Sequence, residues 1–131
     1  MTMILLDTHI WVWWVQGDGR IPPPMWGILE SNEKYGLGVS IVSCLEVARL
    51  VAHGRLTIPL PIDQWIDDAL KYPHMRLIEL TPQIAIDSTR LPGVFHKDPC
   101  DRIIVATAMT LGWKIATVDR DILSYSAVSC I

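Results

Sequence analysis

The stretch HKDPCDRIIVATAMTLG, residues 96–112, is the most informative part of this sequence for the fold. Asp98 followed by Pro99 is a typical helix start, because Asp caps free N–H groups and Pro suits the first helical position. Asp101 falls at the third helical position, where a carboxylate can reach back to the cap. Gly112 is a typical helix end. The motif predicts a helix that opens with two carboxylates, and helix capping alone could account for both.

The rest of the chain alternates between short apolar runs and helical patterns. Strands are predicted near Met3, Gly36, Arg76, Lys114 and Ala127. Helices are predicted over 8–17, from Pro24 onward, and over 40–54, 62–72 and 82–91. This alternation predicts an α/β fold with a parallel sheet and helices on both faces. The 131 residues show no repeat, low-complexity tract or linker, so we expect a single domain over residues 1–131.

The composition excludes several classes of protein. Half of the residues are hydrophobic and 19% are charged, which argues against disorder. No apolar run approaches the roughly 18 residues of a membrane span, and the N-terminus lacks a basic signal-peptide region. We therefore expect a cytoplasmic protein without membrane association. The three cysteines, an odd number without metal-type spacing, are expected to be reduced and mostly buried.

The net charge of −3 argues against a general nucleic-acid coat protein. It does not exclude an enzyme that acts on nucleic acid. If five of the 14 acidic residues were gathered in a metal-binding pocket, nine would remain against 11 Lys and Arg. The surface outside such a pocket would then be mildly basic.

Acidic residues recur where predicted strands end and helices begin. Asp7 ends the first strand and Asp119 the fourth, Asp98 and Asp101 open the helix between them, and Glu46 lies in the second turn of the helix after the second strand. Strand carboxyl ends and helix N-termini share one edge of a parallel sheet, where ligands bind. Carboxylates gathered there need a cation to offset their repulsion. Oxygen ligands without a His or Cys companion favour Mg²⁺ or Mn²⁺.

Each acid also has a purely structural interpretation. Asp7 could cap the first helix, and Asp119 could be a turn residue. Glu46 could extend from an apolar helix into solvent. The metal-site hypothesis depends on all of these acids occurring together.

Four motifs carry a resemblance to a known family. They are LLDTHIWVWW at 5–14, SIVSCLE at 40–46, HKDPCDRIIVATA at 96–108 and ATVDRDI at 116–122. On these motifs the chain resembles a PIN domain, specifically the small VapC-like bacterial and archaeal proteins. The resemblance implies a three-layer α/β/α sandwich with a central, mostly parallel sheet. It also implies a metal-dependent endoribonuclease that hydrolyses RNA phosphodiester bonds, as the toxin of a toxin–antitoxin pair.

The same resemblance assigns roles to individual positions. The family's four catalytic acids fall on Asp7, Glu46, Asp101 and Asp119. Together with the additional Asp98 of the Asp-Pro-x-Asp-Arg form, they are the expected ligands of Mg²⁺ or Mn²⁺. Thr8 and Thr117 match small hydroxyl positions beside the site, whereas His9 departs from the usual Ser or Asn.

Basic residues border these acidic motifs. Lys97, Arg102 and Arg120 are candidates for phosphate contacts, but a surface lysine or an arginine paired with a neighbouring acid is the alternative that we favour. His96 is a candidate general base, against the favoured alternative of a solvated loop histidine.

Three tryptophans, Trp11, Trp13 and Trp14, cover most of the first helix. One face must pack on the sheet, and the remainder either packs in the core or forms an interface, where Trp is enriched. The apolar content and the family resemblance predict a homodimer. We also expect a small antitoxin protein that covers the tryptophan surface and directs a basic side chain toward the carboxylates.

Other functional classes stay open at this point. A haloacid-dehalogenase-like phosphatase would need a second Asp two residues after Asp7, where this chain has His9. A receiver domain would need paired acids near the start, and these are absent. A non-catalytic RNA-binding PIN module and a housekeeping nuclease without an antitoxin are the alternatives closest to the leading hypothesis.

Overall fold

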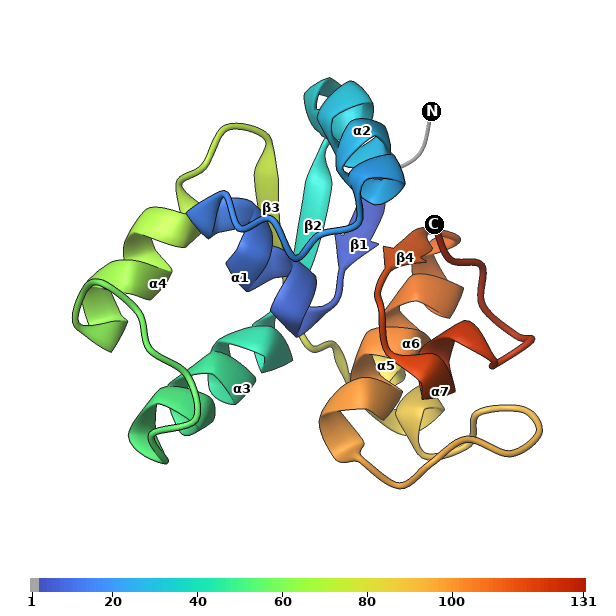
Figure 1. Cartoon of the computed structure of the whole chain (residues 1–131). Helices are drawn as coiled ribbons and strands as arrows, with labels where there is room; N and C mark the ends of the chain where they lie inside the picture. Colours follow the sequence, from blue (N-terminus) through green and yellow to red (C-terminus); the bar gives the residue numbers. More distant parts are fainter. Residues whose placement is uncertain (1–2) are drawn as a thin grey trace.

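The computed structural model describes residues 3–131, and its centre is a parallel sheet with helices on both faces (Figure 1). Within these residues the sheet has four strands in the order β3-β2-β1-β4. The strands are β1 Ile4–Leu6, β2 Leu37–Ser40, β3 Met75–Ile78 and β4 Lys114–Ala116. The helices are α1 Thr8–Gln16, α2 Pro23–Asn32, α3 Ile41–Ala52, α4 Ile62–Leu70, α5 Pro82–Ser88, α6 Pro99–Leu111 and α7 Arg120–Leu123, with a short 3₁₀ turn η1 at Glu33–Tyr35. The predicted fold class is confirmed.

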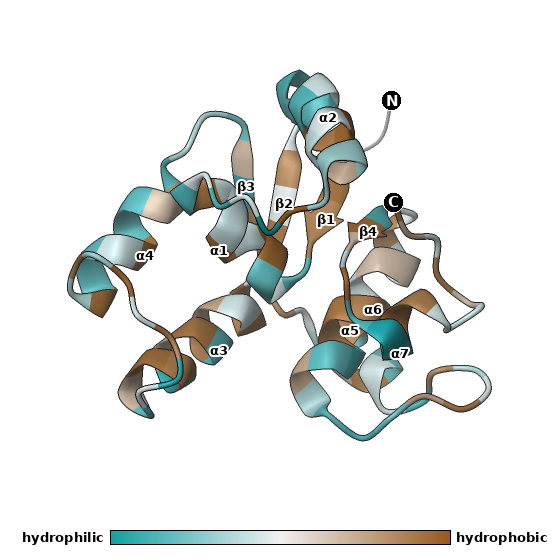
Figure 2. Cartoon of the chain, viewed as in Figure 1, coloured by the Kyte–Doolittle hydropathy of each residue, from teal (hydrophilic) through white to brown (hydrophobic). Residues whose placement is uncertain are grey.

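The sheet divides the interior into two cores, because successive strand side chains point to opposite faces. Ile4 and Leu6 of β1 pack with α1, α2 and α4, whereas Leu5 packs with α5, α6 and α7. Figure 2 shows β1 as hydrophobic, while α2 and α4 carry hydrophilic residues on their outer sides. The buried strands therefore fix the sheet in place between two helical layers.

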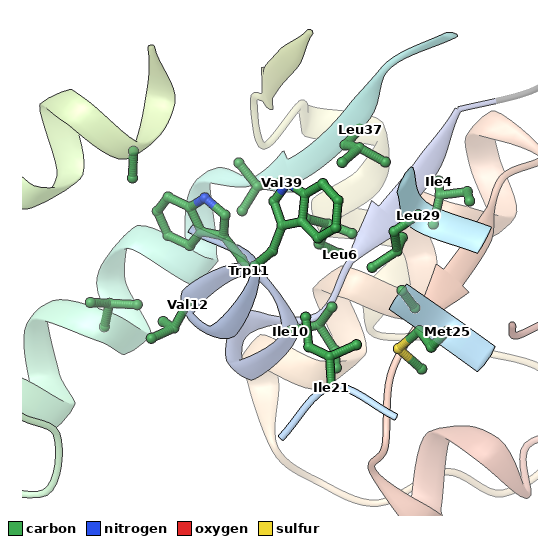
Figure 3. Packing of buried hydrophobic residues seen from close by; sticks show 14 of the residues in the cluster. Ile4, Leu6, Ile10, Trp11, Val12, Ile21, Met25, Leu29, Leu37 and Val39 are labelled. Atoms are coloured by element: carbon green, nitrogen blue, oxygen red, sulfur yellow. The ribbon is translucent and has the colours of Figure 1, made fainter. Parts of the chain in front are cut away.

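The tryptophans of α1 pack mainly in the core. Trp11 is fully buried and meets Trp65 edge-on, with ring centroids 5.2 Å apart. Figure 3 shows it beside the sheet residues Leu6 and Val39. Trp14 is also buried and lies 4.6 Å from Trp26, between ring centroids. Only Trp13 is partly exposed, so the expected tryptophan interface is wrong for most of this surface.

The C-terminal segment differs from the prediction. The expected fifth strand near Ala127 is reduced to a single bridge between Ile115 and Cys130. Ile115 makes two backbone hydrogen bonds there, to Ser129 and Ile131. Strand β4 has only three residues, so it offers this segment little length for pairing.

No helix in the part of the chain from residue 3 to residue 131 combines the length and apolar character that crossing a membrane requires.

Candidate metal centre

Asp7 lies between the end of β1 and the start of α1, and both of its carboxylate oxygens accept hydrogen bonds. Oδ1 accepts a hydrogen bond from the Thr8 N–H at 2.8 Å, which makes Asp7 the helix cap. Oδ2 accepts one from the Thr117 hydroxyl at 2.7 Å. The residue is only 8% exposed, and burial raises its pKa, against the opposing effect of the Thr117 hydrogen bond. The structure thus fixes a buried carboxylate at the carboxyl end of a central strand.

Asp119 is joined to Asp7 through Thr117. The Thr117 hydroxyl accepts a hydrogen bond from the Asp119 N–H at 2.9 Å while it donates to Asp7. Asp119 does not end a strand as predicted, because β4 stops at Ala116. It caps α7 instead, and its Oδ1 accepts from the N–H groups of the next turn. The other oxygen, Oδ2, is free of any such cap bond among residues 3–131.

Glu46 reaches the same region from inside α3. The Thr8 hydroxyl donates to Glu46 Oε1 at 2.5 Å, and the Ser43 hydroxyl lies 2.8 Å from the Thr8 oxygen. Since the single Thr8 hydroxyl proton goes to Glu46, Ser43 donates to Thr8. Burial raises the Glu46 pKa, and the nearby charge of Asp7 adds to the effect. The purely structural interpretation, in which Glu46 extends into solvent, is therefore wrong.

Asp98 caps α6 as predicted, and its Oδ1 accepts a hydrogen bond from the Asp101 N–H at 3.1 Å. The reciprocal half of a capping box does not form. The Asp98 N–H donates instead to His96 Nδ1 at 3.3 Å, so Asp101 is not required there. The prediction that Asp101 reaches back to the cap is wrong.

Asp101 is the acid whose ionisation the site opposes most clearly. Its side chain is 18% exposed, and its pKa rises to about 8. Burial is the first cause, followed by the negative charges of Asp7, Asp98, Glu46 and Asp119. All five predicted acids thus act on one another at this edge of the sheet. Like charges can share such a site only if a cation or a proton offsets them.

His96 belongs to the site, although a solvated loop residue was favoured from the sequence. Its Nε2 atom is buried and lies 3.1 Å from Asp101 Oδ2, without meeting the geometry of a hydrogen bond to any group in residues 3–131. The same atom lies 4.0 Å from Asp121 Oδ2. Ligand atoms of His96, Asp101 and Asp119 all lie within 4.8 Å of one another. His96 was a candidate from its place beside the acidic motif, but its irregular loop carries no periodic pattern that would place the ring against Asp101.

A second group within 4.8 Å joins Glu46, Asp98 and Cys100. Burial and the Glu46 carboxylate raise the pKa of Cys100 to about 11, which keeps the thiol protonated at neutral pH. A protonated thiol is a poor metal ligand, because metals bind the thiolate. This side of the site therefore offers oxygen atoms rather than sulfur.

Arg102 does not face the acidic site. Its Nε donates to the Ser88 carbonyl at 2.7 Å, and its Nη1 donates to the carbonyls of Phe95 and His96 at 3.1 and 3.2 Å. The guanidinium therefore fastens the loop before α6. Among residues 3–131 it forms no ion pair with an acid, so the alternative favoured from the sequence is wrong for Arg102. Lys97 and Arg120 are exposed.

The donor set suits a hard divalent cation. Carboxylate oxygens from Asp7, Glu46, Asp101 and Asp119 converge, and the Thr8 and Thr117 hydroxyls hold three of these acids in place. Mg²⁺ prefers a few carboxylates and water molecules over a closed protein cage. The partly exposed arrangement leaves room for such waters. His96 adds one nitrogen atom, which Mn²⁺ tolerates better than Mg²⁺.

Comparison with known proteins agrees with this geometry. The PIN domain family model matches residues 4–128. The chain is 33% identical to Ribonuclease VapC22 of Mycobacterium tuberculosis, over 95% of this chain and 93% of that protein.

Solved structures show the same fold at low sequence identity. VapBC2 from Rickettsia felis, bound to a DNA fragment from their promoter, matches with a TM-score of 0.71 at 14% identity, over 99% of this chain and 98% of that one. FitAcB from Neisseria gonorrhoeae matches with a TM-score of 0.66 at 19% identity, over 98% and 96%. A toxin–antitoxin complex from Klebsiella pneumoniae matches with 0.65 at 20%, over 95% and 94%. With the family model covering nearly the whole chain, this protein belongs to the PIN-domain family.

Proposed function

We propose that this protein is a metal-dependent endoribonuclease and the toxin of a toxin–antitoxin pair, and that residues 1–131 act as a single domain. The observation that carries the proposal is the gathering of five carboxylates at the carboxyl edge of the sheet, where the Thr8 and Thr117 hydroxyls hold three of them and their charges raise the pKa of Asp101. A structural role does not require such a concentration of charge. A relative at 33% identity is named a ribonuclease, which supports RNA as the substrate.

Asp7, Glu46, Asp101 and Asp119 are the proposed ligands of Mg²⁺ or Mn²⁺, with Asp98 at the exposed rim. When bound, the ion lowers the pKa of a coordinated water and stabilises negative charge on the scissile phosphate. The Thr117 hydroxyl orients Asp7 and the Asp119 backbone together, and Thr8 orients Glu46. These hydrogen bonds hold the carboxylates in position before any ion arrives, which lowers the cost of binding it.

The solved relatives also support a protein partner. The Klebsiella protein was solved as a toxin–antitoxin complex, so we propose a small antitoxin for this chain and a homodimer as its free state. Trp11 and Trp14 are buried, so of the α1 tryptophans only the partly exposed Trp13 is available to the antitoxin. A basic antitoxin side chain directed at the acids remains part of the proposal. Light scattering of the free protein tests the dimer, and a monomer at high micromolar concentration would contradict it.

The decisive experiment measures cleavage of a mixed RNA pool by the purified protein with Mg²⁺, with Mn²⁺ and with EDTA. We expect cleavage with either ion, none in EDTA, and none by Asp101→Asn with either ion. Co-expression with the antitoxin should suppress the activity. RNA binding without cleavage under all metal conditions would instead identify a non-catalytic RNA-binding module.

A further inference from the structure

A second concave surface adjoins the acidic site on the side of His96. It is a cleft of about 520 Å³ between the 92–96 loop and residues 121–127. Three aromatic rings contribute to its lining, and the Phe95 ring lies 4.4 Å from the His96 ring and 4.9 Å from the Tyr125 ring, between centroids. Ser124 and Ser126 also line the cleft. The volume falls within the range of small-ligand sites.

The loop that forms this cleft is fastened at both ends. Near its start, the Tyr125 hydroxyl donates a hydrogen bond to the Pro92 carbonyl. Near its end, Arg102 donates to the carbonyls of Phe95 and His96. Gly93 turns the chain between these anchors with a φ of +69°. The cleft is therefore built into the fold, and a ligand would not have to order the loop.

The cleft and the acidic site share His96. One edge of its ring, at Nε2, lies 3.1 Å from Asp101, while the ring itself lines the cleft. Asp121 also lines the cleft, with its Oδ2 4.0 Å from the same nitrogen. A polynucleotide whose phosphate reached the acids would thus have its neighbouring nucleotide at this cleft.

The charge of the lining selects which part of a nucleotide fits. Among the described residues the cleft is lined by Asp121 and by no Lys or Arg, so a phosphate is disfavoured there. A base is neutral, and it stacks on aromatic side chains with little dependence on sequence. Its edges can form hydrogen bonds with serine hydroxyls and with the Asp121 carboxylate, which accepts from base amino groups.

We propose that this cleft is a subsite for the base of the nucleotide next to the scissile phosphate in single-stranded RNA. The proposal rests on the proposed ribonuclease function and names a substrate contact for it. Phe95 is the stacking residue. Val94, at 96% exposure the most exposed large apolar side chain in the described chain, stands at the mouth of the cleft.

The test combines a substitution of Phe95 in the protein with removal of one base from the RNA, and compares the single changes with the two together. The cut position in a 12-nucleotide RNA is mapped first, and abasic versions are then made at the nucleotide on either side of it. With wild-type protein we expect one abasic version to lose about tenfold in kcat/KM, the size expected for losing one stacked base. Phe95→Leu, which keeps apolar volume but removes the ring, should lose about tenfold on the parent RNA. On that abasic RNA the kcat/KM of Phe95→Leu should be little lower than on the parent RNA, because the variant has no stacking contact left to lose.

Val94→Asp is the second variant, because so exposed a side chain contributes little to folding. It adds a negative charge at the mouth of the cleft, and we expect a fivefold or greater loss in kcat/KM. Gln64→Asp adds the same charge at an exposed position of α4 and should leave kcat/KM unchanged. Thermal melts check that all variants fold.

Binding of the fluorescein-labelled 12-mer in EDTA, followed by anisotropy, separates this proposal from the ribonuclease proposal. If the wild-type protein cuts no RNA, the ribonuclease proposal fails, and the binding data still test the cleft. Weaker binding by Phe95→Leu and Val94→Asp, but not by Gln64→Asp, supports the subsite. Wild-type binding and kcat/KM in a folded Phe95→Leu variant would overturn it, as would equal abasic losses in wild type and variant.

Discussion

The carboxyl edge of the sheet has two halves that begin their helices with different side chains. On the β2/β3 half, α3 and α5 are capped by the neutral hydroxyls of Ser40 and Thr81. On the β1/β4 half, α1 and α7 are capped by the carboxylates of Asp7 and Asp119. All four caps accept hydrogen bonds from the first turn, so the same structural need is met in two ways.

The difference shows what capping explains and what it does not. Ser, Asp and Asn are nearly equivalent as helix caps, so a neutral cap would serve α1 and α7 equally well. Asp7 is buried with a raised pKa, so its charge opposes folding where a serine would not. Capping therefore does not account for the acids on the β1/β4 half, whereas the proposed binding of a cation would.

The largest effect should come from Asp101→Asn, which removes charge from the β1/β4 half and keeps the shape of the side chain. Cleavage should fall below detection, while the metal-free protein should become more stable by up to about 5 kcal/mol near pH 8, since the Asp101 pKa lies about four units above its usual value and each unit corresponds to about 1.4 kcal/mol. Activity assays and urea melts in EDTA measure both quantities. Asp63→Asn, on exposed α4, is the matched control and should change neither.

The same substitution should alter the pH dependence of stability. Between the usual pKa of 3.8 and the folded-state pKa of about 8, folded Asp101 binds more protons than the unfolded chain. The metal-free wild-type protein should therefore lose stability as pH rises through this window, and Asp101→Asn should flatten the loss. Equal slopes in the two proteins would contradict the assignment of Asp101 as the destabilising charge.

Addition of Mg²⁺ or Mn²⁺ should reverse that loss. An ion at 100 times its dissociation constant stabilises a folded protein by about 2.7 kcal/mol. The gain should be larger at pH 8 than at pH 5, because protons compete with the metal for the carboxylates. Thermal melts across both pH values measure it. If Tm does not respond to either ion at pH 8, the metal-site proposal fails.

A smaller effect is expected at Asp98, where the cap and the charge can be separated. Asp98→Ala should cost about 0.5–2 kcal/mol through loss of the α6 cap, with cleavage reduced but measurable. Asp98→Asn retains the cap and should restore the stability. Urea melts and cleavage assays distinguish these variants. Complete inactivity in a stable Asp98→Asn variant would show that Asp98 is a metal ligand as well as a cap.

The smallest effect is expected on the β2/β3 half. Thr81→Asp keeps a cap on α5 and places an anion on the half that has none among its caps. Stability should change by less than about 0.5 kcal/mol, and the Mg²⁺ concentration that half-saturates the Tm shift should not change. A clear change in Mg²⁺ affinity would mean that a charge on the β2/β3 half acts on the metal site, and would contradict the division of the edge into two halves.

Much of the fold could be predicted because its signals are local. Asp98-Pro99 and Gly112 mark the ends of α6 in the sequence, and the structure places the helix between them. The last strand was overestimated, since the alternation near Ala127 does not reveal that β4 offers only three residues for pairing. Strand length at an edge depends on its neighbour, which a single segment does not encode.

The residues of the candidate site also divide into those with a local signal in the sequence and those without one. Its acids were visible in the sequence because each begins a helix or lies on one. His96 and Arg102 were misjudged, because their roles depend on an irregular loop. Arg102 fixes that loop through carbonyls six and seven residues earlier in the chain, and this brings the His96 ring to Asp101. No periodic pattern predicts hydrogen bonds of this kind.

The bond from Thr117 to Asp7 has a consequence for the timing of synthesis. It joins residues 110 positions apart, and the sheet sets β4, among the last elements translated, directly beside β1. At roughly 5–20 residues per second, the ribosome needs about 5–20 s to progress from one residue to the other. A nascent chain that has not reached β4 lacks both Thr117 and Asp119. The ribosome that makes this protein is thus not exposed to a complete acidic site until the chain is nearly finished.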